Sequence, residues 1–112
     1  MFPLPTMNLV PTMTVESSQN PDPFSNPVTF TATVTAPNNP GNLTPTRTVQ
    51  FWEVNPATGA NIALLATVTL DSSGQASFTT SSLNRGSHRI KALYLGDSNF
   101  MSSFSTFDEM II

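Results

Sequence analysis

The sequence predicts an all-β domain, a sandwich or barrel of about seven short strands. Stretches in which apolar and polar residues alternate recur along the chain at intervals of roughly 8–12 residues, separated by turn-forming residues. No stretch shows the apolar period of an amphipathic helix. Charged residues make up only 10% of the chain, and threonine and serine are abundant. This composition is typical of strands with polar but uncharged faces.

The chain length fits one domain with one hydrophobic core, since it has 112 residues. Pro3, Pro5 and Pro11 lie close together at the start. Proline fixes φ and removes a backbone donor, so residues 1–11 are predicted to form an extended arm or linker. Residues 12–112 are then a single domain.

Residues 28–35, VTFTATVT, form the clearest predicted strand. Val28 and Phe30 start an apolar register that faces the core, and threonines fill the opposite register. In the stretch 62–70, one register holds Ile62, Leu64, Ala66, Val68 and Leu70, which are expected on a single face. The full set of predicted strands covers residues 13–18, 28–35, 46–54, 62–70, 75–83, 87–95 and 100–112.

The last predicted strand does not have a single apolar face. Phe104 and Met110 share one parity, as does Ile112, while Phe107 and Ile111 share the other. A β-bulge would bring both sets to one face, and bulges are common at sheet edges. We therefore expect a bulge in this strand.

Two polar stretches, Asp71–Gly74 and Gly96–Asn99, contain oxygen-bearing side chains that a calcium ion could use. A calcium loop needs acids at alternate positions, and neither stretch has them. Asp, Asn and Gly are also the residues that tight turns prefer. Both stretches are predicted to be turns, and no metal site is expected.

Several classes of function are disfavoured by what the sequence lacks. It has no cysteine, which excludes disulfides and thiolate metal sites, and its net charge of −3 without a basic cluster argues against nucleic-acid binding. No apolar run approaches the roughly 20 residues of a membrane span, and the first residues do not read as a signal peptide. No acid pair or nucleophile–base set is visible, so no catalytic residues and no cofactor are predicted.

Four stretches together resemble a known family. They are NPVTFTATVTA (26–36), TRTVQFWE (46–53), LLATVTLDSSGQASFTTSSLNRGSHRIKALYLGDSNF (64–100) and SSFS (102–105). The chain is similar to the bacterial immunoglobulin-like repeat domains that occur in tandem on large surface and secreted proteins. The resemblance implies an immunoglobulin-like β-sandwich of about seven antiparallel strands in two sheets. It also implies a non-catalytic role and an extracellular or cell-surface location.

The single histidine, His88, is predicted to be structural. Its parity matches that of Ile90 and Tyr94, so it faces inward, two residues after Gly86. A polar ring at such a corner of a sandwich often hydrogen-bonds to the preceding loop. We therefore expect a structural corner made of His88, Gly86 and Leu83.

A second set of apolar residues is predicted to face outward. Trp52 has the opposite parity to Phe51, and Leu93 and Leu95 have the opposite parity to Tyr94. The immunoglobulin arrangement makes the third and sixth strands neighbours, with the last strand beside them. The predicted contact surface is Trp52, Leu93, Leu95, Phe104 and Phe107. The alternative is that the loop 36–45 or the arm covers these side chains. The family usually has small or polar residues in place of the two leucines.

Three functions remain open from the sequence. The first is a structural or adhesion module of an extracellular bacterial protein, with neighbouring Ig-like domains or copies of itself as partners. The second is a self-assembling subunit of a filament or virion surface, joined by β-strand addition through its termini. The third is a module that binds a glycan or a surface protein through Trp52, whose ring offers a stacking platform.

Overall fold

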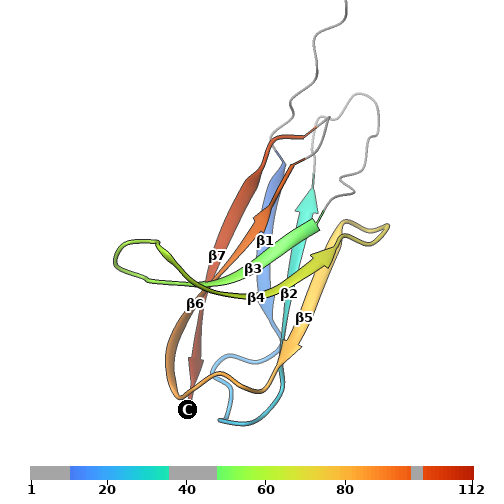
Figure 1. Cartoon of the computed structure of the whole chain (residues 1–112). Helices are drawn as coiled ribbons and strands as arrows, with labels where there is room; N and C mark the ends of the chain where they lie inside the picture. The colour runs from blue at the N-terminus through green and yellow to red at the C-terminus, as the bar shows by residue number, and fades with distance from the viewer. Residues whose placement is uncertain (1–10, 36–47, 97–99) are drawn as a thin grey trace, which may run out of the picture.

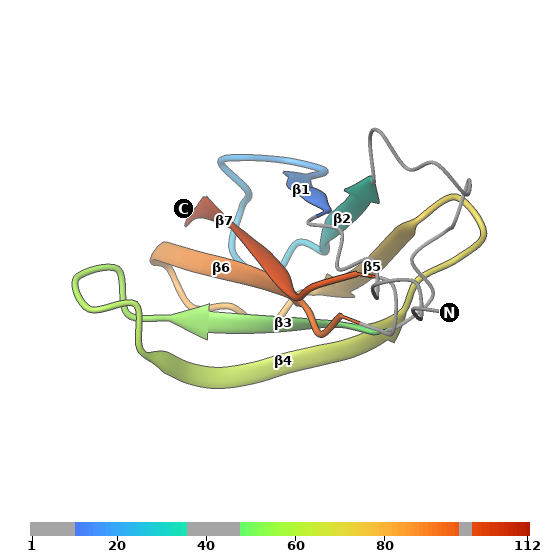
Figure 2. The ribbon, with the colours of Figure 1, turned by 90° about the horizontal axis from the view of Figure 1, so that it is seen from above.

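The computed structural model describes residues 11–35, 48–96 and 100–112, and they form two antiparallel sheets (Figure 1). Seen from above, the sheets are two packed layers (Figure 2). The predicted sandwich of seven antiparallel strands is confirmed, and no helix occurs in the described residues. The three-stranded sheet has the order β1 (Thr12–Ser17), β2 (Val28–Thr35), β5 (Gln75–Thr80); the four-stranded sheet has the order β4 (Asn61–Thr69), β3 (Thr48–Val54), β6 (Gly86–Tyr94), β7 (Ser103–Ile111).

The strand boundaries agree with the sequence analysis most closely in β2, which spans the predicted residues. β5 ends at Thr80 instead of continuing to residue 83, and the chain then turns so that Leu83 enters the core. β7 begins at Ser103 rather than at Phe100, which is buried and lies in a bridge outside the strand. The predicted arm up to residue 10, the loop 36–45 and the turn residues 97–99 lie outside the described residues.

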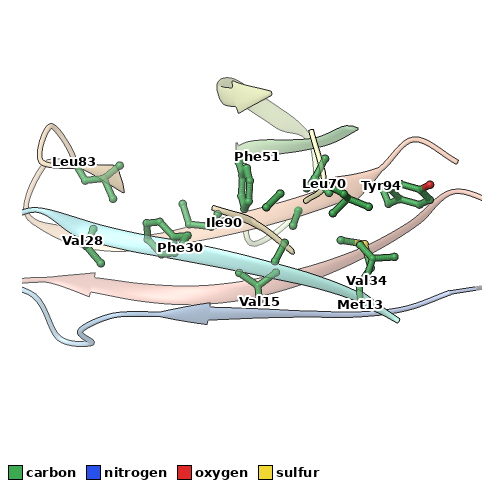
Figure 3. Close-up of a cluster of buried hydrophobic side chains, with 14 of the residues drawn as sticks. Met13, Val15, Val28, Phe30, Val34, Phe51, Leu70, Leu83, Ile90 and Tyr94 are labelled. Atoms are coloured by element: carbon green, nitrogen blue, oxygen red, sulfur yellow. The ribbon is translucent and has the colours of Figure 1, made fainter. Parts of the chain in front are cut away.

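The core lies between the sheets and is built from the apolar registers of their strands (Figure 3). Phe30 of β2 and Phe51 of β3 approach from opposite layers, and neither is exposed. Phe78 of β5 joins them, with ring centroids 5.5 Å from Phe30 and 4.7 Å from Phe51. Each fully buried side chain of this size stabilises the fold by about 1.5–3 kcal/mol, so this aromatic cluster holds the layers together.

β4 departs from its predicted register. Phe51 pairs with Ala66 but its neighbour Trp52 pairs with Leu64, so Leu65 is an extra residue on β4. A second irregularity follows between Glu53 and Val54. A bulge changes which face the next residues occupy. Leu64 therefore does not share the inner face of Ala66, and the predicted single face of residues 62–70 is wrong for its first half.

β7 departs from its prediction in the opposite way. It pairs with β6 over nine consecutive positions without a register shift, so the expected bulge is absent. Phe107 and Ile111 face the core, whereas Phe104 and Met110 are exposed on the other face. β7 therefore carries large apolar residues on both of its faces, and a regular strand without a bulge accounts for the sequence pattern.

The predicted turn at Asp71–Gly74 is present. The Gly74 amide donates to the Asp71 carbonyl at 3.0 Å, and the Asp71 carboxylate accepts from the Ser73 amide at 2.8 Å. Gly74 has a φ of 77°, and a Cβ there would lie 2.7 Å from the Val34 carbonyl oxygen. Glycine is required by both constraints.

β1 and β7 belong to different sheets but lie side by side at the edge of the sandwich (Figure 1). The segment after β1 runs parallel to the end of β7, with a bridge between Asp22 and Ile111. Three backbone bonds fasten it: Asp22 N to Met110 O at 2.9 Å, Ile112 N to Asp22 O at 3.0 Å, and Phe24 N to Ile112 O at 2.8 Å. We call this pairing of residues 20–24 with the end of β7 the terminal clasp.

Candidate contact surface and the His88 corner

The outer face of the four-stranded sheet gathers apolar side chains in two neighbouring rows. Gln50 of β3 pairs with Leu93 of β6, which pairs with Phe104 of β7. In the next row, Leu64 pairs with Trp52, and Trp52 pairs with Lys91. Side chains in such rows are close enough to interact across the strands. We call Leu64, Trp52, Leu93, Leu95 and Phe104 the outer strip.

The outer strip is accessible. Phe104 is 64% exposed, Leu64 48% and Leu95 41%, while Trp52 and Leu93 are half-buried. The Trp52 indole nitrogen donates to Gln50 Oε1 at 3.1 Å, which satisfies the one polar group of that ring. Single exposed apolar residues are ordinary, whereas a clustered set that spans four strands is less so. The loop 36–45 and the arm, which the sequence analysis named as an alternative cover for this face, lie outside the described residues.

The charges on this face are few and unevenly placed. Lys91 lies within the strip, with Nζ 5.6 Å from the centroid of the Phe104 ring, a cation–π distance. At one end, Arg89 donates twice to Asp108, at 2.7 and 3.1 Å. The Arg89 hydrogen bond lowers the pKa of Asp108, and the charge of Arg89 adds to that effect. One cation therefore sits among apolar side chains, and an ion pair stands at the rim.

The structure changes the predicted surface at two positions. Phe107 was predicted as part of it, but it faces inward and packs against the core, 6.4 Å from Phe30 between ring centroids. Its parity differs from that of Phe104, and without a bulge the two rings must face opposite ways. Leu64 was missed, although the adjacent leucines at 64 and 65 already required one of them to face outward.

His88 lies at the inner-face end of β6, where it joins three segments. Its Nε2 is 2.6 Å from the Asn84 carbonyl oxygen in the preceding loop, the kind of contact that the sequence analysis expected. Its Nδ1 is 2.7 Å from Glu53 Oε2 on β3, a partner that the sequence did not predict. Gly86 has a φ of 122° and Leu83 is buried. The ring thus connects β6, β3 and the loop between β5 and β6.

Two buried carboxylates lie near the terminal clasp. Glu109 is 1% exposed and accepts a short hydrogen bond from the Ser17 hydroxyl, and Asp22 accepts from Asn26 Nδ2 at 2.7 Å. Burial raises the pKa of Glu109, and the charge of Asp22 raises it further; Ser17 and His88 oppose that shift. The Ser17–Glu109 contact connects β1 to β7, and the Asn26–Asp22 contact closes the loop after β1.

The described residues contain no group of three or more His, Asp or Glu side chains that could hold a metal ion. Within the same residues, no helix is long and apolar enough to cross a membrane.

The comparisons with known proteins agree with this architecture. The model of the family described as bacterial Ig-like domain (group 3) matches residues 14–109, nearly the whole described sandwich. No curated protein and no solved structure matches the chain.

Proposed function

Because the chain belongs to the group 3 bacterial Ig-like domains, we propose that it is a spacer of an extracellular bacterial protein, a non-catalytic module that carries tension along a stalk. Domains of this family are structural modules typical of surface proteins. The specific proposal is the mechanical role, and it is supported by how the two terminal strands are joined.

The observation that best supports the mechanical role is the terminal clasp. β1 starts at one end of the sandwich and β7 ends at the opposite end, so force applied to the chain on either side runs along both strands (Figure 1). β1 and β7 lie side by side and run in the same direction (Figure 1), and the segment after β1 continues this arrangement through the parallel bridge between Asp22 and Ile111. A force along parallel neighbours shears all of their contacts together instead of opening them one by one. Resistance then depends on the whole clasp.

Asn20 is the side chain that ties the clasp most directly. Its Oδ1 accepts from the Met110 amide at 3.0 Å, and its Nδ2 donates to the Asp108 carbonyl at 3.1 Å. These are two hydrogen bonds across a sequence separation of about ninety residues. Each such bond contributes about 0.5–1.5 kcal/mol at equilibrium.

Single-molecule pulling between the chain ends tests the proposal. We expect a distinct unfolding event at a high force, and a lower force for Asn20→Ala. Asn61→Ala, an exposed asparagine at the start of edge strand β4, is the matched control and leaves the force unchanged. Unfolding without a resolved force peak, or equal forces for Asn20→Ala and the parent chain, contradicts the mechanical role.

A glycan-binding function is the second candidate, favoured by the partly exposed Trp52 ring on the outer face of β3. Aromatic rings of this kind offer an apolar surface with a polar edge. A glycan array with the parent chain and Trp52→Ala tests it. Binding that disappears with Trp52→Ala supports this function, and the absence of any Trp52-dependent signal removes it.

A further inference from the structure

We propose that the terminal clasp is sensitive to protons: it tightens when Glu109 takes up a proton in mild acid and loosens when Glu109 loses it. This inference rests on the mechanical role proposed above and adds the regulation of that role, because the acidity of the surroundings then sets how firmly the terminal strands are joined. Three features support it, which are the hydrogen bonds of Ser17, the burial of two acids, and the charged groups that face Glu109.

The hydroxyl of Ser17, at the end of β1, has one hydrogen but contacts two acceptors. Its Oγ lies 2.9 Å from the Gln19 carbonyl oxygen and also contacts Glu109 Oε1. A carbonyl oxygen and an ionised carboxylate can only accept hydrogen bonds, so Ser17 can satisfy only one of them at a time. A proton on Glu109 removes this conflict, because its O–H then donates to Ser17 Oγ and the Ser17 hydroxyl donates to Gln19. The Gln19 amide donates to the same Oγ at 3.2 Å, so the hydroxyl then makes one donor and two acceptor contacts, its full capacity.

The residues that Ser17 holds lead directly into the terminal clasp. When Glu109 carries a proton, the Ser17 side chain binds both backbone groups of Gln19 and also β7. The next residue, Asn20, makes two hydrogen bonds to the backbone of β7, and Asp22 then pairs with the end of that strand. Without the proton one of the Ser17 bonds is missing, so the segment that enters the clasp is held less firmly.

Burial also favours the neutral form of Glu109. Glu109 is 1% exposed and Asp22 is not exposed. Glu109 Oε2 and Asp22 Oδ2 are buried, and neither has a hydrogen-bond partner among the described residues. Asp22 pairs with Ile111, and Glu109 lies two residues before Ile111 on the same inward face of β7. Two buried negative charges in one region oppose each other, and a proton on one of them relieves both the repulsion and the burial of charge.

One basic side chain faces Glu109 and opposes this effect. His88 is the register partner of Glu109 on β6, and a positive charge on its ring favours the ionised form of the acid. The ring also lies 2.7 Å from Glu53 Oε2, so His88 is shared between two carboxylates. The other charged side chains on the elements around Glu109 lie at exposed positions or on the outer face of the four-stranded sheet: Glu16, Arg85, Arg89, Lys91 and Asp108.

Together these effects raise the pKa of Glu109, and burial is the largest cause. A raised pKa means that the folded chain holds this proton more firmly than the unfolded chain does. The contribution of Glu109 is therefore full at pH below the unfolded value and is lost as pH rises through the folded value. The clasp is expected to be firmest in mild acid and weaker toward neutral pH.

Hydrogen exchange of the whole chain, followed by NMR, tests this expectation. The amides of Asp22, Phe24 and Ile112 donate across the clasp and report its local opening. Exchange rates are converted to protection factors, which removes the intrinsic effect of pH on exchange. We expect protection of these amides to be at least about twofold higher at about pH 4.5 than at about pH 7.5. The Val34 amide, which donates to the Gly74 carbonyl away from the clasp, is the reference and should change less.

Three variants assign the effect to Glu109. Glu109→Gln keeps a donor and an acceptor at every pH, so its clasp amides should show the acid level of protection at both pH values. Glu16→Gln, at an exposed acid of β1, is the matched control and should keep the difference of the parent chain. Asp22→Asn removes the neighbouring negative charge, so the carboxyl carbon signal of Glu109 should titrate at lower pH than in the parent chain. This second variant keeps the test open if Glu109→Gln does not fold, which circular dichroism shows.

The outcomes separate this inference from the spacer role. Equal protection of the clasp amides at the two pH values overturns the proton-sensitive clasp, as does a difference in Glu109→Gln that equals that of the parent chain. An unchanged titration of Glu109 in Asp22→Asn also contradicts it. Protection that rises in acid in a chain without a resolved unfolding force removes the spacer role alone. A clear unfolding force with protection independent of pH removes the proton dependence alone.

Discussion

The two faces of the four-stranded sheet both carry large apolar side chains, but those side chains differ in how deeply they are buried. On the inner face Phe51 has no exposure and contacts Phe78, while on the outer face Phe104 is 64% exposed and lies beside Lys91. The inner ring contacts a ring from the second sheet, whereas the outer ring contacts a lysine of its own sheet. Burial between layers, not residue type, decides which apolar side chains stabilise the fold.

The same contrast holds for two acids that follow each other on β7. Asp108 faces outward and pairs with Arg89, which lowers its pKa. Glu109 faces inward, and its burial raises its pKa. Neighbours in sequence thus respond to pH in opposite directions because a strand places them on opposite faces.

The largest expected difference between the faces is in aromatic truncation. Phe51→Ala should lower the free energy of unfolding by about 3–5 kcal/mol, because it leaves a cavity in the core. Phe104→Ala should change it by about 0.5 kcal/mol or less, since the ring is mainly exposed. Urea titration of both variants measures the contrast. Similar losses for the two variants would contradict the assignment of the outer ring to contact rather than stability.

The second effect concerns the His88 corner. His88→Ala removes the contacts to Glu53 and to the Asn84 carbonyl, and should cost about 1–3 kcal/mol because both groups lose a partner. In a domain of about this size, each kcal/mol lowers the melting temperature by roughly 4–8 °C. Ser87→Ala, its exposed neighbour, is the control. An unchanged melting temperature for His88→Ala would count against the structural corner.

The third effect is the pH dependence of the inner acid. The pKa of Glu109 is raised in the folded state, so its contribution to stability is full at pH below the unfolded value and is lost as pH rises through the folded value. Glu109→Gln keeps an acceptor for Ser17 and should flatten the rise in stability from neutral pH toward acid. Denaturation at several pH values measures this pH dependence, with Glu16→Gln, at an exposed residue of β1, as control. If the stability of Glu109→Gln changed with pH as steeply as that of the parent chain, the pH dependence could not be assigned to Glu109.

The smallest effect is that of the outer acid. The pKa of Asp108 is lowered, so its contribution is present at pH above the unfolded value and is lost as pH falls through the folded value. The ion pair is solvent-exposed, so Asp108→Asn should change stability little at neutral pH and less still at high salt. Denaturation of Asp108→Asn at several pH values measures this change in stability. A loss larger than that of His88→Ala would mean that the rim pair is structural.

Some of this site followed from the sequence. Parity placed Trp52 and Leu93 on the face opposite Phe51 and Tyr94, because successive side chains of a strand point to opposite sides. The family resemblance supplied the neighbouring strands. Phe104 was named together with Phe107, and parity alone did not decide between them. The His88 contact with its preceding loop also followed, since it is a local arrangement at a sandwich corner.

The alternation of apolar and polar residues determined, by itself, that the chain forms strands and which residues of each regular strand share a face. That pattern is local and survives in any sheet. Only the tertiary structure decided the bulge that turns Leu64 outward, because a bulge exists only against the partner strand β3. It also decided that Ser17 meets Glu109 across 92 residues, since such contacts depend on how the sheets pack. The sequence therefore predicts which side chains of a regular strand share the outer face. The pairing of the strands decides which of those side chains lie together in the outer strip.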